Sequence, residues 1–334
     1  MNILSTKSSI IKNLSKKKVI VLGDLFLDEY IFGSSNRISP EAPVPVVNFE
    51  NVKTNLGGAG NVVENLSNLN LEVIPVSILG FDDISNKIEK FLEKKKISTK
   101  GIIKDKNYNG IKKTRVMAKN NQVVRIDYEN INEDISIKYF KKIKKFISEK
   151  INSLDFVIIS DYGKGFCEKK IVKFVIKICN SKKIKVLIDP RKKLGDYSIY
   201  RNANYISPNL GELRSIFPNL KDENKDIMKI CKKLIKQLSI KNIIVTRGSK
   251  GISFVDKNIF KNLESEAKEV FDVSGAGDTV IATFSSSLAL GLNAIKSLKI
   301  SNKCAGSVIS KIGTQPVELN NFINFYLKET EKSK

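Results

Sequence analysis

The sequence predicts an α/β fold in which helices cover both faces of a doubly wound, mostly parallel sheet, with a small β-sheet lid attached. Short apolar, β-branched runs alternate along the chain with amphipathic helical segments. Uninterrupted apolar runs of this kind are typical of parallel strands that are buried on both faces. Two segments, about 30–52 and 111–128, carry strand-like pieces with little helix between them, so they predict the separate lid sheet.

The individual elements follow from the spacing of the apolar residues. Strands are predicted at 18–23, 73–79, 156–160, 186–189, 205–207 and 243–246. Helices are predicted at 59–69, 84–96, 135–151, 169–180, 223–238, 277–290 and 294–311. No linker divides the 334 residues, so we expect a single domain, 1–334, with the lid inserted in it. Ligands of such a fold bind beyond the carboxyl ends of the strands.

The composition excludes several classes of chemistry. The chain has no histidine, which excludes Ser-His-Asp and Cys-His catalysis and histidine-ligated zinc. The four cysteines form no C-x-x-C pair, so neither a disulfide framework nor a zinc knuckle is indicated. Carboxylates, lysines, arginines, hydroxyls and backbone amides remain. Phosphoryl transfer can be catalysed with this set, because positioning and charge stabilisation supply most of its catalysis.

The formal net charge of +23 does not predict a nucleic-acid partner. Nearly all of the positive charge is lysine spread along the chain on polar helix faces, as in the run from Tyr139 to Phe146, and no RNA- or DNA-binding motif accompanies it. A positive field would still attract phosphorylated substrates. No run approaches the roughly 20 apolar residues of a membrane span, and the N-terminal apolar stretches are too short for a signal peptide. We therefore expect a cytoplasmic enzyme with no membrane partner.

The segment from Asp272 to Thr279 (DVSGAGDT) is the most informative motif for function. Its glycines allow a tight turn at the start of a predicted helix, where free amides and the helix dipole favour an anion. Asp278 beside such a cradle could accept the proton of a hydroxyl while the amides hold a phosphoryl group. The alternative is that Asp278 only caps an ordinary helix after a glycine turn.

Other polar residues follow strands along the chain. Asp24 and Asp28 come after the first strand and could hold sugar hydroxyls, or act in capping and turns. A glycine-rich stretch, 56–61, lacks the spacing of a dinucleotide or P-loop motif and ends in Asn61. Three more strand ends carry the sequences SDYGKG (160–165), SPNLGE (207–212) and TRGSKG (246–251, a turn between strands). Glu212 in the second could cap a helix or hold a magnesium-bound water.

These motifs resemble those of the ribokinase family of carbohydrate kinases over about 18–318, nearly the whole chain. The resemblance is carried by G-G-x-x-N (Gly57, Gly58, Asn61), N-x-x-E (Asn209, Glu212) and D-x-S/T-G-A-G-D (272–278). It implies the ribokinase-like fold, ATP with Mg²⁺, and a sugar as acceptor. Asp278 would be the catalytic base, and the anion hole would be formed by Gly275, Ala276 and Gly277.

The resemblance also implies the binding residues. ATP would be bound by Asn209, Leu210, Gly211, Glu212, Thr246, Gly248, Gly251 and Asn302, with Glu212 holding Mg²⁺ through water. Sugar hydroxyls would be held by Asp28, Gly57, Gly58 and Asn61. Some relatives bind a monovalent cation such as K⁺, for which Asp272 and Ser274 are the matching positions. Gly60, Gly211 and Ser274 depart from the most frequent residues at their positions without removing a reactive group.

Longer strings resemble one branch, the bacterial D-glycero-β-D-manno-heptose 7-phosphate kinases. These strings are 37–46, 114–127, 160–165 and 188–190. The branch implies phosphorylation of the anomeric hydroxyl to the 1,7-bisphosphate, for ADP-heptose in lipopolysaccharide or surface polysaccharide synthesis, and a homodimer formed through the lid. Because the H-x-G-H motif of the adenylyltransferase that often accompanies the kinase is missing, we expect the stand-alone form. Candidates for binding the substrate phosphate are Arg37, Arg115, Arg125 and Lys164.

Two alternatives remain at this point. Another sugar or sugar-phosphate kinase of the same family would share Asp278 and the nucleotide site but differ in the lid. A non-catalytic protein that binds a ligand or nucleic acid through its basic surface would not need Asp278.

Overall fold

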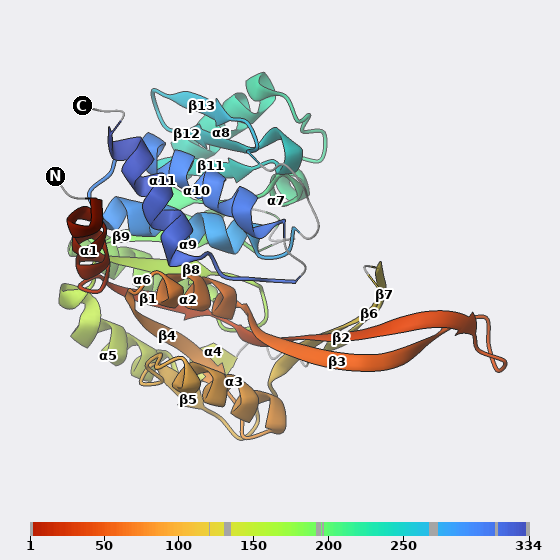
Figure 1. The fold of residues 1–334 in the computed structure, drawn as a ribbon. Coiled ribbons are helices and arrows are strands. Elements are labelled where there is room, and N and C mark those ends of the chain that lie inside the picture. The colour runs from red at the N-terminus through yellow and green to blue at the C-terminus, as the bar shows by residue number, and fades with distance from the viewer. Residues whose placement is uncertain are drawn as a thin grey trace.

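The central element of the fold is a nine-stranded sheet (Figure 1). The structure is a computed structural model, and it describes residues 3–119, 121–129, 135–191, 195, 197–266, 273–310 and 313–331. From one edge of the sheet to the other, the strands are β13 (Phe260–Leu263), β12 (Ile252–Val255), β11 (Asn242–Thr246), β10 (Tyr205–Ile206), β9 (Lys185–Asp189), β8 (Phe156–Ser160), β1 (Lys18–Gly23), β4 (Glu72–Leu79) and β5 (Ile102–Lys104). Neighbouring strands from β11 to β5 are parallel, whereas β12 and β13 are antiparallel. The predicted mostly parallel sheet is confirmed.

Helices cover both faces of this sheet because successive side chains of a strand point to opposite faces. Ile20 and Leu22 belong to a core formed with α5 (Phe140–Lys150), α6 (Lys169–Ser181), α7 (Leu210–Ile216) and α8 (Asn224–Leu238). Val19 and Val21 belong to the core on the other face, formed with α1 (Ile3–Leu14), α2 (Ala59–Asn68), α3 (Asp83–Lys94), α9 (Ala276–Ala289), α10 (Ala294–Val308) and α11 (Leu319–Glu331). Among the described helices, none has the length and apolar character needed to cross a bilayer.

Each predicted strand and helix is present, with ends that differ by a few residues. The helix predicted at 135–151 is divided into α4 (Ile135–Lys138), α5 and a 3₁₀ turn (Ile151–Ser153). Four elements, α1, α11, β5 and β13, were not predicted, and α7 and β12 (Ile252–Val255) were expected only as a helix start and a strand without bounds. The strands β5 and β13 are only three and four residues long, too short for a periodic signal, and both lie at sheet edges. In α1 and α11, polar residues such as Lys and Asn interrupt the apolar spacing.

The lid is a four-stranded sheet with the strand order β3-β2-β6-β7, formed by β3 (Pro45–Gly58), β2 (Leu25–Ile38), β6 (Ile111–Ala118) and β7 (Asn121–Tyr128). The β2–β3 hairpin extends far from the body of the protein (Figure 1). Its strands start earlier and end later than the predicted segment 30–52, because Gly57 and Gly58 continue the β3 ladder against Phe26 and Leu25. The lid is therefore joined directly to β1 and α2, and it carries Asp28 in its sheet.

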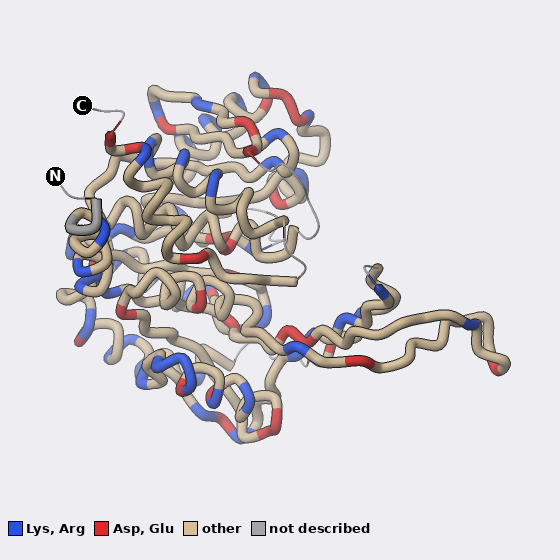
Figure 2. The backbone as a smooth tube through the Cα atoms, in the orientation of Figure 1, with Lys and Arg blue, Asp and Glu red and all other residues tan. Residues whose placement is uncertain are grey.

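Positive charge is distributed over most elements, with carboxylates among the lysines and arginines (Figure 2). The lysines of α5 and α8 lie mainly at exposed or half-buried positions. This distribution agrees with the expectation of solvated helix faces.

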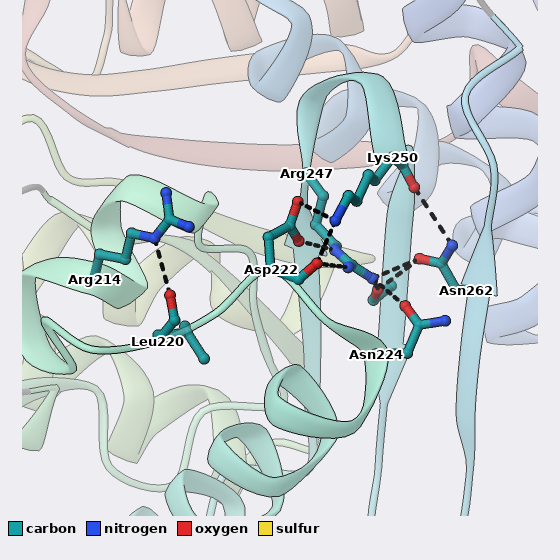
Figure 3. Close-up of polar contacts among 8 residues, drawn as sticks. Arg214, Leu220, Asp222, Asn224, Arg247, Lys250 and Asn262 are labelled. Carbon is teal, nitrogen blue, oxygen red and sulfur yellow. Dashed lines mark hydrogen bonds and ion pairs between the residues drawn. The ribbon is translucent and has the colours of Figure 1, made fainter.

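The turn between β11 and β12 is held by a buried arginine (Figure 3). The Nε atom of Arg247 donates to Asp222 Oδ1 at 2.7 Å, and its Nη1 atom donates to Asn262 Oδ1 at 3.1 Å and to Asn224. Lys250 adds an ion pair with Asp222 at 3.4 Å. The guanidinium joins the start of α8 to β13 and so fixes the turn after Thr246, from which the candidate nucleotide residues come.

We expect Arg247→Ala to destabilise the fold by about 1–3 kcal/mol, because Asn224 and Asn262 each lose a buried donor while Lys250 still pairs with Asp222. The measurement is the free energy of unfolding from urea denaturation. The control is Arg201→Ala, at an exposed position, which should change it by less than about 0.5 kcal/mol. Equal effects of the two substitutions would contradict the structural role of Arg247.

Candidate functional site

A cleft of about 870 Å³ lies beyond the carboxyl ends of the central strands and under the lid. It brings together the lid strands β6 and β7, the loop after β8, the start of α7 and the start of α9, as the doubly wound topology predicts. Its lining includes these sequence-predicted residues: Lys164, Asn209, Glu212, Thr246, Gly275, Gly277 and Asp278.

Asp278 lies in the first turn of α9 with only 4% of its surface exposed. Its carboxylate accepts hydrogen bonds from Asn61 Nδ2 at 3.2 Å and from the Tyr162 hydroxyl at 3.1 and 3.3 Å. Gly275, not Asp278, is the N-cap residue of α9. The alternative that Asp278 caps the helix is therefore wrong, and its carboxylate is turned toward the cleft residues.

Burial raises the pKa of the Asp278 carboxyl to about 7, although the hydrogen bonds from Tyr162 and Asn61 lower it. The negative charges of Asp28 and Glu212 raise this pKa further. A carboxylate with a pKa near neutrality can accept and release a proton under ordinary conditions, which is the property that a general base needs.

The turn before α9 provides only part of the predicted anion hole in its present arrangement. Gly275 has a φ of 78°, in the left-handed region that favours glycine, and Gly277 has open space where a side chain would be. The Ala276 amide donates to the Val273 carbonyl oxygen at 3.2 Å, so it would have to exchange this bond to contact an anion. Ser274 lies in the same turn, whereas Asp272 lies outside the described residues.

Asp28 lies where the lid meets the glycine-rich stretch. Its carboxylate is 3.0 Å from Arg115 Nη1, and burial raises its pKa although Arg115 lowers it. A Cβ atom on Gly57 would lie 2.4 Å from Asp28 Oδ2, so a glycine is required for this close approach. Gly58 follows as the residue before α2, and Asn61 in the first turn of α2 reaches Asp278. These residues adjoin Asp278 through Asn61, but none of them is among the residues that line the cleft.

The predicted nucleotide residues lie at the ends of β10 and β11. Asn209 is the N-cap of α7 and forms a capping box with Glu212, whose carboxylate accepts from the Asn209 amide at 2.8 Å and from its Nδ2 at 2.6 Å. Asn209 also forms a parallel bridge with Thr246. The capping alternative for Glu212 is confirmed, and a contact with a water molecule would use the remaining lone pairs of the same carboxylate.

The other predicted nucleotide residues lie in α7, in the turn after β11 and in α10, and they are not among the residues that line the cleft. Leu210 and Gly211 begin α7, and Gly248 and Gly251 form the turn between β11 and β12. Asn302 in α10 is buried, and its Nδ2 atom donates to the Glu264 carbonyl oxygen at 2.6 Å. Within the part of the chain that the structure describes, no cluster of three or more carboxylates or cysteines forms a ready metal site.

The loop after β8 is held by two buried carboxylates. Asp24 accepts from the backbone amides of Lys164 at 3.1 Å and Phe166 at 3.0 Å. Asp161 accepts from the Gly163 amide at 2.9 Å and from the Tyr200 hydroxyl at 2.7 Å. Burial and the charge of Asp161 raise the pKa of Asp24 to about 7. Asp24 therefore fixes a loop, in agreement with the alternative that it acts in a turn rather than holding sugar hydroxyls.

The basic candidates have different positions. Arg115 is paired with Asp28, Lys164 is paired with Glu129 at 2.7 Å, and Arg125 is paired with Asp127 at 2.8 Å. Lys164 and Arg125 line the cleft. Arg37 is exposed on the outer part of β2, opposite Val46, and is not among the residues that line the cleft.

Three residues that the sequence analysis did not assign are important at the site. Tyr162 contacts Asp278, Lys113 lines the lid side of the cleft, and Arg191 pairs with Asp161 at 3.2 Å. Tyr162 lay within a recognised motif, whereas the charge of Lys113 could not be distinguished among the many lysines.

Comparison with known proteins finds relatives over most of the chain. The "Bifunctional protein HldE" of Aliarcobacter butzleri (strain RM4018) is 38% identical over 314 residues, which are 93% of this chain and 65% of that protein. The chain thus spans less than two thirds of the length of this relative.

Two solved structures share the fold at low identity. Ribokinase of Arabidopsis thaliana complexed with ribose and ATP has a TM-score of 0.73 at 17% identity, covering 93% of this chain and 98% of that one. Phosphofructokinase-2 of Escherichia coli in complex with potassium has a TM-score of 0.75 at 14% identity, covering 94% and 99%.

The family model described as pfkB family carbohydrate kinase matches residues 16–320. The chain belongs to this family of carbohydrate kinases, and its fold is ribokinase-like.

Proposed function

We propose that this protein transfers the γ-phosphoryl group of ATP to the anomeric hydroxyl of D-glycero-β-D-manno-heptose 7-phosphate, giving the 1,7-bisphosphate. The strings that resemble heptose 7-phosphate kinases and the 38% identity with HldE support this substrate. The observation that carries the proposed chemistry is the buried Asp278 carboxylate, which lies between the lid and the nucleotide residues on one cleft wall.

Asp278 acts as the general base in this proposal. Its carboxylate accepts the proton of the sugar hydroxyl while the hydroxyl oxygen attacks the phosphoryl group. Asn61 and Tyr162 hold the carboxylate from two sides, so its orientation is fixed before the substrate binds. The sugar hydroxyl would replace or share the hydrogen bond of Tyr162.

The start of α9 stabilises the charge of the transferring phosphoryl group. The first turn of a 14-residue helix presents amides and the positive end of the helix dipole. Gly275 and Gly277 line the cleft beside Asp278, so the base would act on the attacking hydroxyl while these amides stabilise the oxygens of the phosphoryl group next to it.

Kinases of this family use ATP with Mg²⁺, and the oxygen donors at the ends of β10 and β11 suit such a pair. Asn209, Glu212 and Thr246 supply amide, carboxylate and hydroxyl oxygens to the cleft. When bound, Mg²⁺ neutralises charge on the phosphates. Glu212 would hold a metal-bound water, and Gly248, Gly251 and Asn302 would surround the nucleotide. The K⁺ site stays a prediction, since Asp272 lies outside the described residues.

The test of function is ATP consumption against heptose 7-phosphate, unphosphorylated heptose, ribose, fructose and fructose 6-phosphate. We expect turnover chiefly with heptose 7-phosphate and a loss of roughly 10²–10⁴-fold in kcat for Asp278→Asn, the magnitude typical of a removed general base. The control is Asp83→Asn, at an exposed position in the first turn of α3, which should keep full activity. Turnover chiefly with another sugar would contradict the heptose assignment, and an active Asp278→Asn would contradict the base.

The pH dependence provides a second test of Asp278. We expect kcat/KM to fall as the pH drops through about 7, because the protonated carboxyl cannot accept the proton. Tyr162 lowers the pKa of Asp278, so Tyr162→Phe should raise this pKa and move the fall to higher pH. Tyr326→Phe on α11 serves as the control and should leave the profile unchanged. An unshifted profile in Tyr162→Phe would contradict the role of the hydrogen bond.

We also propose that the protein dimerises through the lid. Large exposed hydrophobic side chains gather on the lid, where they include Phe49 at 66% exposure, Ile38, Val52, Val124 and Ile126. A patch of this kind on a projecting sheet is typical of a protein interface.

We expect Phe49→Glu to shift the protein from dimer to monomer in sedimentation velocity experiments, because the interface would have to bury a charge. Phe81, which is 63% exposed but lies outside the lid, gives the matched control Phe81→Glu, which should remain dimeric. A wild-type monomer at micromolar concentration would contradict this proposal.

A further inference from the structure

The cleft carries a second set of charged residues at its lid end, away from the start of α9. Three cations, Lys113, Arg125 and Lys164, and two carboxylates, Asp127 and Glu129, line this end. Arg125 is paired with Asp127 at 2.8 Å, and Lys164 with Glu129 at 2.7 Å. Once these pairs are formed, one positive charge remains.

That charge belongs to Lys113. Of the cations that line the cleft in the described ranges, Lys113 alone has no carboxylate within ion-pair distance. Its ammonium lies over the ring of Phe26 at 4.7 Å, and burial lowers its pKa although the nearby charges of Asp28, Asp127 and Glu129 raise it. A partly buried ammonium of this kind gains from an anionic ligand more than an exposed surface lysine does.

The register of the lid places Lys113 on the face of the sheet that carries Asp28. Lys113 is in register with Asp28 of β2 and with Asp127 of β7, so these three residues share one face of the lid sheet. Phe26, which lies under Lys113, packs edge-on against Tyr162 at 5.2 Å, and Tyr162 contacts Asp278. Lys113 is thus separated from the base by two aromatic rings, so a substrate that reaches both must extend along the cleft.

Arg115 is less suited than Lys113 to bind an anionic ligand. Its guanidinium is already bonded to the buried Asp28 at 3.0 Å and lies 5.1 Å from the ring of Tyr30. Moving it onto a ligand would leave Asp28 as a buried carboxylate without this partner, which is costly. Arg37 is exposed on the outer part of the hairpin.

We propose that Lys113 binds the phosphate monoester that the sugar substrate carries remote from its reacting hydroxyl, and that Arg125 and Lys164 complete this site. The inference rests on the proposed function, since it requires a substrate that is already phosphorylated. A dianionic phosphate compensates the charge of Lys113 and offers further oxygens to the guanidinium of Arg125 and the ammonium of Lys164. The site therefore selects sugar phosphates over neutral sugars.

The experiment compares steady-state kinetics of the wild type, Lys113→Met, Lys113→Arg and Lys112→Met with heptose 7-phosphate, fructose 6-phosphate and the neutral sugars heptose and fructose. Methionine keeps the unbranched stem over Phe26 and removes only the charge. Lys112 is the matched control, because it precedes Lys113 on β6, is paired with Glu29 at 3.0 Å and does not line the cleft. Thermal unfolding of each variant checks that the fold is retained.

We expect Lys113→Met to raise the KM for the sugar phosphate by roughly 10- to 100-fold, as removal of a charge-assisted contact does. The KM for ATP should be unchanged, Lys113→Arg should recover part of the loss, and Lys112→Met should resemble the wild type. A KM for the sugar phosphate within twofold of wild type in a folded Lys113→Met would overturn the assignment.

The same data separate this inference from the proposed function. If the wild type prefers fructose 6-phosphate and Lys113→Met raises the KM for that substrate, the heptose assignment fails and the phosphate site stands. If the wild type prefers heptose 7-phosphate and Lys113→Met leaves its KM unchanged, the phosphate site fails and the function stands. Turnover of neutral sugars alone overturns both.

Discussion

The burial of one carboxylate constrains the whole site. Asp278 is removed from water in the first turn of α9, and it can remain there because Asn61 from α2 and Tyr162 from the loop after β8 donate hydrogen bonds to it. Burial without these donors would raise its pKa further. Three segments far apart in the sequence must therefore converge on a single side chain. The parallel sheet achieves this because it places the carboxyl ends of its strands at one edge.

The other buried carboxylates around the site also depend on hydrogen-bond donors from neighbouring segments. Asp24 and Asp161 each accept backbone amides from the loop that carries Tyr162, and Asp28 holds Arg115. Asp24 and Asp161 accept from backbone amides, whereas the donors to Asp278 among the described residues are the side chains of Asn61 and Tyr162, and Asp278 lines the cleft. The difference in environment separates the structural carboxylates from the one that is placed to react.

The lid strands are joined almost directly, along the chain, to the elements that carry the site. The strand β2 begins two residues after β1 ends, and β3 leads without a loop into α2. Movement of the lid sheet would therefore be transmitted to Asp28, Gly57 and Asn61 together. A ligand held by both Lys113 and the start of α9 would bridge the lid and the body, which gives the lid a physical reason to close over a phosphorylated sugar.

The sequence by itself determined the fold class and the position of the main motifs, because both depend on local patterns. Apolar runs and helical spacing predicted the sheet and its covering helices, and the stretch from Gly275 to Asp278 predicted an anion-binding helix start beside a carboxylate. The tertiary structure alone decided which polar groups meet. Tyr162 and Asp278 are 116 residues apart, Glu212 uses its carboxylate to cap α7, and Arg37 lies on the exposed part of a long hairpin. Among the cations that line the cleft in the described ranges, Arg125 and Lys164 have ion-pair partners and Lys113 has none at that distance. Which polar groups become paired depends on strand register and burial, because these bring together residues that no local sequence pattern connects.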